Sequence, residues 1–426
     1  MKDALPTTLI EVQKLRVGMF IHLDVGWMAH PFPLSSFKIS SADQIATIRG
    51  LGKAQVRWCP DRSDPETPHP ACAVVAVPAP GVEAPAESPQ GAQARRHREA
   101  LASARARLLL CERQFAEATQ ACRQATELVL SQPERACELV EGLSRAFVDK
   151  MIGEQEMCIR LLTDGAGDKA SHHAVNVTVI SLLMGRTFGL SEAEMMDLGV
   201  GALMHDIGKL ELPERVRYRD ESFTVAEAQF YQEHVARGVA QARKMGLQPG
   251  AALVIGQHHE HADGSGFPLK LNSDRMTTAA RIVSLVNRYD NMCNPHVPSR
   301  ALTPHEALSL LFAQGKNRYD TAILGAFIRM MGVYPPGSAV QLTDDRYALV
   351  MSVNSTRPLK PTVLVHDPKV PRGEALPLNL ETDTRLGIRR SLKPQQLPSE
   401  TLAYLSPRPR VAYYFEPQVE PEGMTS

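Results

Sequence analysis

A proline-rich break divides this chain and constrains the rest of its fold. Seven prolines lie between Pro65 and Pro89, mixed with alanine, glutamate and serine. Such a segment cannot bury a core and is typical of a flexible or semi-extended linker, which we expect over residues 65–94. The chain must therefore fold as separate units, and its 426 residues allow two or three domains.

The composition excludes several classes of protein. Hydrophobic residues make up 43% of the chain and charged residues 22%, an ordinary balance for a globular protein. The formal net charge is +0, so nothing favours a nucleic-acid polymer as partner. No apolar run approaches the roughly 20 residues that span a bilayer, and the polar N-terminus does not match a signal peptide. Seven cysteines without a CxxC pair favour reduced thiols, so we expect a cytoplasmic protein without a membrane span.

The N-terminal residues 1–64 are predicted to form a small α/β module. Residues 7–27 mix short β-type runs with turn residues. SSADQIATIRGLG (40–52) is typical of a short helix, and QVRWC (55–59) of a closing strand.

Residues 95–165 are predicted to form a helical connector. Apolar residues recur there at +3 and +4 spacing over four heptads: Leu101, Ala104, Leu108, Cys111, Phe115, Ala118, Cys122, Ala125 and Val129. SQPE (131–134) matches a capping box with proline in the first turn, so a second helix should begin there. The seam fits a helical hairpin packed on its own domain about as well as a dimerising coiled coil through residues 101–129.

The pattern from 166 to 337 is almost wholly helical. Capping boxes at Ser191–Glu194 and Thr224–Glu227 should open helices, and Gly246 should end the second of these. After residue 337 the sequence pattern changes from helical to strand-like, with a predicted hairpin around Asp344-Asp345 and a further strand in TVLVHD (362–367). We therefore expect a mainly α protein with a β-containing extension and tail over 338–426.

The informative histidines stand on or beside separate predicted helices: His172-His173, His205-Asp206, His234 and His258-His259. Neutral imidazole and carboxylate bind first-row divalent metals, and converging helices can build such a site inside a bundle. An imidazole and a carboxylate at the end of an apolar helix cost free energy unless they are paired or bind a metal. The pattern therefore indicates a metal site.

These motifs, in this order, resemble the signature of the HD-GYP family. HDIGK (205–209), YQEHVARG (231–238) and HHEHADGSGFP (258–268) look like the family's ordered motifs, with GFP in place of the GYP tripeptide. HAVNVTVISLLMG (173–185) resembles the family's first helix, which selects His173 rather than His172. Residues 15–39 resemble the DUF3391 module that is often joined to HD-GYP domains.

The resemblance implies an HD-type helical bundle that hydrolyses c-di-GMP to pGpG and/or GMP in bacterial second-messenger signalling. It implies two divalent metal ions, iron or manganese, with zinc or nickel as alternatives. Carried over by motif position, the ligands are His173, His205, Asp206, His234, His258 and His259. Two close cations can activate a bridging water and clamp a phosphodiester. Asp206, which would bridge the ions, and Lys209, which would contact phosphate or the leaving oxygen, are the expected catalytic residues.

Three departures from the family pattern matter. Asn287 stands where the family has its last metal carboxylate, and its amide oxygen is expected to be a weak ligand, with Asp290 on nearly the same helix face as the substitute. Lys169 stands where some members bind a third metal through glutamate, so we expect two ions. Phe267 replaces tyrosine, which keeps stacking but loses one hydroxyl hydrogen bond.

The substrate is expected to contact Lys209, the loop Gly266-Phe267-Pro268, and Arg288 and Arg300. Glu260 fits either an orienting partner for a metal-bound histidine or a surface carboxylate. Two other functions stay open: a c-di-GMP receptor or scaffold weakened by Asn287, and an HD phosphohydrolase for another cyclic dinucleotide or nucleotide. The N-terminal module could also bind a protein partner.

Overall fold

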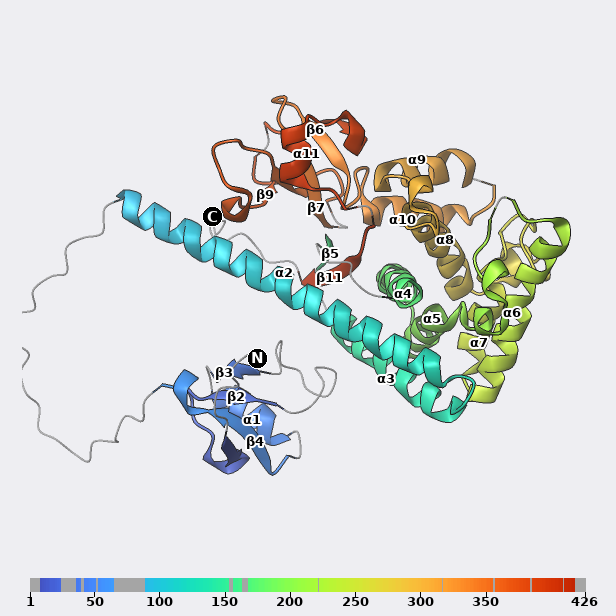
Figure 1. The fold of residues 1–426 in the computed structure, drawn as a ribbon, viewed down its shortest axis with the longest axis horizontal. Helices are drawn as coiled ribbons and strands as arrows, with labels where there is room; N and C mark the ends of the chain where they lie inside the picture. The colour runs from blue at the N-terminus through green and yellow to red at the C-terminus, as the bar shows by residue number, and fades with distance from the viewer. Residues whose placement is uncertain are drawn as a thin grey trace, which may run out of the picture. The chain divides into compact units, whose positions relative to one another are not determined.

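The computed structural model describes residues 8–23, 36–39, 42–50, 53–64, 89–152, 156–162, 168–220, 222–315, 317–354, 357–383, 385–408 and 410–417. They form two compact units, residues 1–100 and residues 101–426 (Figure 1). Most of the predicted linker, residues 65–88, lies outside the described residues. Residues 89–94 of that prediction are helical, because helix α2 begins at Pro89.

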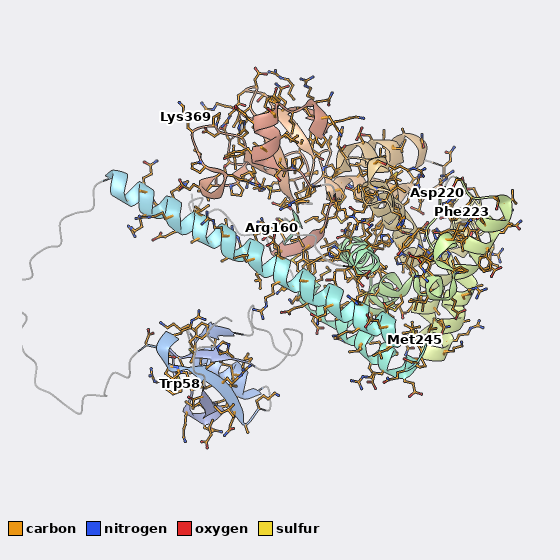
Figure 2. The ribbon with its side chains drawn as sticks, in the orientation of Figure 1. Trp58, Arg160, Asp220, Phe223, Met245 and Lys369 are labelled. Carbon is orange, nitrogen blue, oxygen red and sulfur yellow. The ribbon has the colours of Figure 1, made fainter. Side chains whose placement is uncertain are left out.

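The N-terminal unit contains a four-stranded antiparallel sheet, among the residues described, in the order β1-β4-β2-β3. Its elements are β1 (Thr8–Glu11), β2 (Phe20–His22), β3 (Ser36–Lys38), α1 (Ala42–Gly50) and β4 (Gln55–Cys59). The expected helix and closing strand are both present. The side chain of Trp58, labelled in Figure 2, donates from Nε1 to Ser63 Oγ at 2.7 Å. The small α/β module is therefore confirmed for the residues described.

The second unit is mainly helical. Its helices are α2 (Pro89–Leu128), of which residues 101–128 belong to this unit, α3 (Pro133–Met151), α4 (Lys169–Thr187), α5 (Glu192–Met204), α6 (Val225–Met245), α7 (Pro249–Gln257), α8 (Thr278–Cys293), α9 (Pro304–Gly315), α10 (Thr321–Met331) and α11 (Ser399–Leu405). Complete capping boxes open α5 at Ser191 and α6 at Thr224, as predicted, and Gly246 ends α6 with a φ of 76°. Helix α3 begins at Pro133, but its N-cap is Gln132 without a side-chain bond, so the box predicted at Ser131 does not form. None of the described helices has the length and apolar character that crossing a bilayer requires.

The apolar seam of α2 packs inside its own unit. Cys111, Phe115, Cys122 and Val129 are all buried in one core that also contains Phe147 of α3. Of the two readings of the seam, the helical hairpin is the arrangement in this structure. The homodimer through residues 101–129 stays a prediction, with most of its proposed contact surface already used within the chain.

A second sheet follows the helices, with the main strand order β10-β6-β7-β5-β11; β8 also pairs with β7, and β9 pairs with β8. Its strands are β5 (Met157–Leu161), β6 (Ala339–Leu342), β7 (Tyr347–Asn354), β8 (Thr362–Val365), β9 (Leu378–Asn379), β10 (Ile388–Leu392) and β11 (Tyr413–Pro417). The predicted hairpin joins β6 and β7, and Asp345 has a positive φ of 71° in its turn. The structure differs from the prediction at β5, which lies in the expected helical connector yet pairs with both β7 and β11.

The C-terminal strand is thereby built into the core. Tyr413, Tyr414 and Phe415 of β11 are all buried. Arg160 of β5, labelled near the middle of Figure 2, is mostly buried and forms an ion pair with Glu416 at 2.5 Å. Strand β11 also packs against α4. The predicted β-containing extension is therefore present and packs into the core of the helical unit through β11, and this contact matters for the site below.

Candidate metal centre

The ends of several packed helices bring the motif residues together. His173 lies on α4, and His234 lies within α6. His205 is the C-terminal cap of α5, and His258 is the C-terminal cap of α7. Helix α5 packs against both α4 and α7, so these imidazoles meet in the interior of the bundle.

The glycine of the HDIGK motif permits one of these contacts. Residues Ile207–Glu211 form a short 3₁₀ turn that packs against α6. A Cβ atom at Gly208 would lie 1.9 Å from the backbone oxygen of His234 and 2.5 Å from the nitrogen of Gly238. Only glycine allows that approach, which brings Asp206 Oδ1 to 3.6 Å from His234 Nε2.

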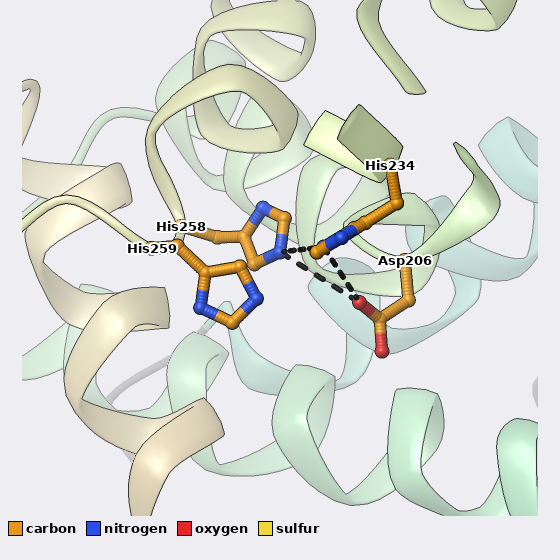
Figure 3. A group of neighbouring side chains, drawn as sticks. All are labelled: Asp206, His234, His258 and His259. Carbon is orange, nitrogen blue, oxygen red and sulfur yellow. Dashed lines mark hydrogen bonds and ion pairs between the residues drawn. The ribbon is translucent and has the colours of Figure 1, made fainter. Parts of the chain in front are cut away.

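Two overlapping groups of side chains have the spacing of metal ligands. In the first group, Asp206, His234, His258 and His259 each offer one atom within 4.8 Å of the others (Figure 3). In the second group, His173, His205 and Asp206 do the same. Asp206 belongs to both groups and lies between them. We call these the His234 group and the His173 group.

The ring nitrogens in these groups face each other with their lone pairs. The Nδ1 atoms of His205, His234 and His258 contact the carbonyl oxygens three residues earlier, at 2.7, 2.5 and 2.8 Å. Because a carbonyl only accepts, each Nδ1 carries the proton and each neutral ring keeps its lone pair on Nε2. Yet His234 Nε2 lies 3.3 Å from His258 Nε2, and His205 Nε2 lies 3.2 Å from His173 Nε2. Converging lone pairs repel unless a cation lies between them.

Burial disfavours protonation of three of these rings. Burial lowers the pKa of His234 to about 3 and also lowers the pKa values of His205 and His259, so these rings are neutral at pH 7. Burial raises the pKa of Asp206, but Lys209 and neighbouring imidazoles outweigh it, and the pKa lies well below its usual value. Asp206 Oδ1 and His259 Nε2 are buried and lack a hydrogen-bond partner among the described residues. Divalent cations would satisfy these atoms, so the donors fit metal ions.

The two candidates for the last carboxylate position lie in different places. Asp290 is fully buried, and its Oδ2 accepts a 2.6 Å hydrogen bond from His173 Nδ1. It therefore stands behind His173, on the side away from the other imidazoles. Asn287 is buried at the cleft surface, and its Oδ1 accepts from Asn291 Nδ2 at 2.6 Å. His172 points elsewhere and contacts Phe115 edge to face.

Lys209 lies beside the shared carboxylate. Its Nζ donates to Asp206 Oδ2 at 2.7 Å and lies 5.5 Å from the centre of the Tyr231 ring. Burial lowers the pKa of Lys209, but Asp206 and Tyr231 outweigh it, so the net pKa is raised and the ammonium is charged. Sequence reasoning missed Tyr231, although its position three residues before His234 places both on one helix face.

The loop after His259 is shaped by backbone contact. A Cβ atom at Gly266 would lie 2.5 Å from the backbone oxygen of His259, so this position requires glycine. The ring of Phe267 stacks on His259 with centroids 4.5 Å apart. Glu260 is fully buried and accepts from the backbone of Leu269 and Leu271 at 2.6 and 2.9 Å. Glu260 thus anchors the loop, and it is neither a surface carboxylate nor a histidine partner.

A cleft of about 1900 Å³ opens above the two groups. It exceeds the roughly 300–1,000 Å³ of typical small-ligand sites. Of the predicted residues, the cleft is lined by His173, Asp206, Lys209, His258, His259, Gly266, Phe267, Asn287, Arg288 and Arg300. His205 and His234 are fully buried, and Pro268 also does not line the cleft.

Further cations that sequence reasoning missed also line this cleft, among them Arg219, Lys270 and Arg318. Arg288 and Arg318 are exposed and form no salt bridge among the residues described, whereas Arg300 lies 3.4 Å from Asp220. Arg318 comes from the segment before α10, far along the chain from any histidine motif, so no sequence signal linked it to the site. The cleft wall is therefore suited to anionic groups.

Comparison with known proteins fits this geometry. A family model described as an HD domain matches residues 156–323, and that of a domain of unknown function, DUF3391, matches residues 7–139. The cyclic di-GMP phosphodiesterase PA4108 of Pseudomonas aeruginosa is 25% identical over 362 residues, which cover 84% of each chain. The cyclic di-GMP phosphodiesterase response regulator RpfG of Xanthomonas campestris is 26% identical, covering 53% of this chain and 54% of its own. The 3'3'-cGAMP-specific phosphodiesterase 3 of Vibrio cholerae is 26% identical, covering 41% and 38%.

The helical bundle, its histidine and aspartate cluster and these matches define an HD-domain protein. Residues 7–139 match the DUF3391 model, and over most of its length the chain is similar to a relative named a cyclic di-GMP phosphodiesterase. The DUF3391 match reaches residue 139, well beyond the module predicted over residues 1–64, and so includes α2 and the start of α3.

Proposed function

We propose that this chain is a metal-dependent phosphodiesterase that hydrolyses c-di-GMP to pGpG and/or GMP. One observation carries the proposal: neutral imidazole lone pairs converge around the Asp206 carboxylate on the floor of a cleft lined with cations. The relatives named cyclic di-GMP phosphodiesterases in Pseudomonas and Xanthomonas support the choice of substrate.

The proposed centre contains two divalent ions, iron or manganese, with zinc or nickel as alternatives. The His234 group and the His173 group would each bind one ion, with Asp206 shared, and Asn287 would be an additional weak ligand. When bound, two such ions supply an activated water and neutralise charge on the phosphoryl oxygens. The mixed nitrogen and oxygen donors suit these metals.

The proposed roles of the other residues follow from their positions. Lys209, next to Asp206, would contact a phosphoryl oxygen of the attacked diester or stabilise the leaving 3′-oxygen. Arg288 and Arg300 would meet phosphate from the cleft wall, and Arg318 joins them in this proposal. Phe267 offers a ring face for a base, and the Gly266-Phe267-Pro268 loop would shape the pocket.

The decisive assay uses protein purified without oxygen and loaded with iron or manganese. We expect conversion of c-di-GMP to pGpG or GMP under reducing conditions, measured by chromatography, together with two bound ions per chain measured by elemental analysis. Asp274→Asn, at an exposed acid outside both groups, is the matched control. Protein that carries two ions and yields no product would contradict the proposal.

A receptor or scaffold function is the second candidate, and Asn287 is the observation that favours it. Its amide brings no charge to the site and already accepts a hydrogen bond from Asn291. This candidate predicts calorimetric binding of c-di-GMP without turnover, and hydrolysis appearing in Asn287→Asp. A different cyclic dinucleotide as substrate is the third candidate, favoured by the relative named for 3'3'-cGAMP. Competition among cyclic dinucleotides separates the third candidate from the first.

We also propose a cytoplasmic location, because the cysteines described are all free thiols, as expected in a reducing compartment. A protein partner for the DUF3391 domain is a further proposal. The homodimer through residues 101–129 is tested by measuring the solution mass of the full chain.

A further inference from the structure

The carboxylate of Asp290 connects the candidate metal centre to the C-terminal end of the chain. Asp290 is fully buried, and its Oδ2 accepts from His173 Nδ1 at 2.6 Å. Its other oxygen, Oδ1, accepts from Asn176 Nδ2 at 3.0 Å and from Asn294 Nδ2 at 2.9 Å. Both oxygens of this carboxylate are therefore committed to side chains on α4 and at the end of α8.

The two asparagines also bind the segment that leads into β11. Asn176 Nδ2 and Asn294 Nδ2 both donate to the Val411 oxygen at 2.9 Å. The backbone nitrogen of Val411 donates to Asn294 Oδ1 at 2.9 Å, and that of Tyr413 donates to Asn176 Oδ1 at 2.9 Å. Each amide thus joins the Asp290 carboxylate to the backbone of residues 411–413.

This segment is itself fixed by the sheet. Strand β11 pairs with β5 along its whole length, and Tyr413 Oη hydrogen-bonds Tyr289 Oη at 3.1 Å on α8. Asn176 is only 1% exposed and Asp290 is fully buried, so their polar groups depend on their partners in this network. Losing a hydrogen bond to a buried carboxylate is more costly than losing an exposed one, because the charge has no water to replace the donor.

The other imidazoles do not share this support. His205, His234 and His258 each bond a carbonyl of their own helix three residues earlier. His173 instead relies on Asp290, which lies 117 residues away in the sequence. A loss of the network at residues 411–413 should therefore displace His173 and leave His205, His234 and His258 in place.

We propose that Asn176 and Asn294 are positioning residues that clamp residues 411–413 to Asp290 and thereby orient His173 for the ion of the His173 group. The proposal rests on the metal centre of the proposed function. A change in the clamp selectively weakens the binding of one of the two ions, because the His234 group does not contact the clamp. The C-terminal strand is in this way a structural part of the metal site.

The experiment uses the isosteric change Asn294→Asp in the full chain. It keeps the volume of the side chain but replaces the donor to Asp290 with a second carboxylate. Calorimetric titration with Mn²⁺ should show one ion bound about 10–100-fold more weakly, as is typical for partners behind metal-binding histidines, and the other unchanged. Asn294→Ala, which adds no charge, should weaken the binding of the same ion. It replaces the first variant in the titration if that variant folds poorly.

Asn354→Asp is the matched control. Asn354 Nδ2 donates to a carboxylate, Glu156 Oε2, at 3.2 Å in the same sheet, and it has no bond to Asp290. The control should leave both Mn²⁺ affinities as in the unaltered protein. Equal weakening of both ions in Asn294→Asp, or equal effects in the control, would overturn the proposal, because they would indicate general loosening of the sheet.

A crystal structure of metal-free Asn294→Asp tests the clamp without any ion. We expect the Asp290 carboxylate and the His173 ring to leave the positions they have here, with His234 and His258 in place. An unmoved His173 ring would overturn the proposal. Failure of the phosphodiesterase function would appear separately, as absent hydrolysis in the unaltered chain with both ions bound.

Discussion

The two halves of the candidate metal centre share Asp206 but are supported in different ways. In the His234 group, two imidazoles are oriented by carbonyls within their own helices, and the third stacks on Phe267. In the His173 group, His173 is oriented by Asp290, and Asp290 is held by two asparagines that also bond the backbone of residues 411–413. One half follows from local helix geometry, whereas the other exists only when distant segments have assembled.

The largest expected effect comes from the residue that the halves share. Asp206→Asn removes the bridging charge, so both ions should be lost and hydrolysis of c-di-GMP should fall by about three orders of magnitude or more. Elemental analysis and a product assay measure the two effects, with Asp274→Asn as the control. Retention of both ions would show that the halves do not depend on a common carboxylate.

The next largest effects are expected from variants that each disrupt only one of the two groups. His234→Ala and His173→Ala should each leave about one ion per chain, and each should lower hydrolysis by roughly 100-fold or more, because two ions act together in the reaction. Stoichiometry from Mn²⁺ titration measures the ion that remains. If either variant loses both ions, the centre is a single cooperative unit and the comparison fails.

A gain in metal affinity is expected when the weak ligand proposed at position 287 is replaced by a carboxylate. Asn287→Asp adds a negative charge at the cleft surface, and Asn291 can still donate to the new carboxylate. Ligand charge strengthens binding of divalent cations, so one Mn²⁺ affinity should rise by about tenfold, with a rise in hydrolysis. Unchanged affinity would mean that position 287 does not reach the ion.

The smallest effect is predicted for the cleft wall. Arg288→Ala should raise KM by about fivefold and leave kcat nearly unchanged, because an exposed cation that meets phosphate contributes about 1 kcal/mol to substrate binding. Arg346→Ala, in the distant β6–β7 turn where Arg346 pairs with Asp344, is the control. A lower kcat with unchanged KM would instead give Arg288 a part in the reaction itself.

Local patterns in the sequence were sufficient for much of the fold. The boxes at Ser191 and Thr224 and the stop at Gly246 depend on residues within one or two turns, and all three formed as expected. The box at Ser131 did not form, although α3 begins at the expected proline. The difference shows that proline at the first helical position was the stronger signal here.

The order of the histidine motifs likewise indicated the HD domain that the family model matches and the side chains that were candidates for one cluster. His173, His205, Asp206, His234, His258 and His259 do come together, because each motif places its imidazole on or at the end of a packed helix. Their roles as ligands stay proposals. The glycines of two motifs, Gly208 and Gly266, have steric reasons that became visible only when the packed backbones were in place.

Only the tertiary structure decided the rest. It placed β5 between β7 and β11, set Asp290 behind His173, turned Glu260 toward its own loop and brought residues 411–413 to Asn176. Helix starts, stops and periodicity arise from neighbours a few residues apart, so a single sequence carries them. The partners of β5 and the long-range hydrogen bonds of Asp290 and Asn176 join residues more than a hundred positions apart, and no local pattern specifies which distant backbone will satisfy a buried polar group.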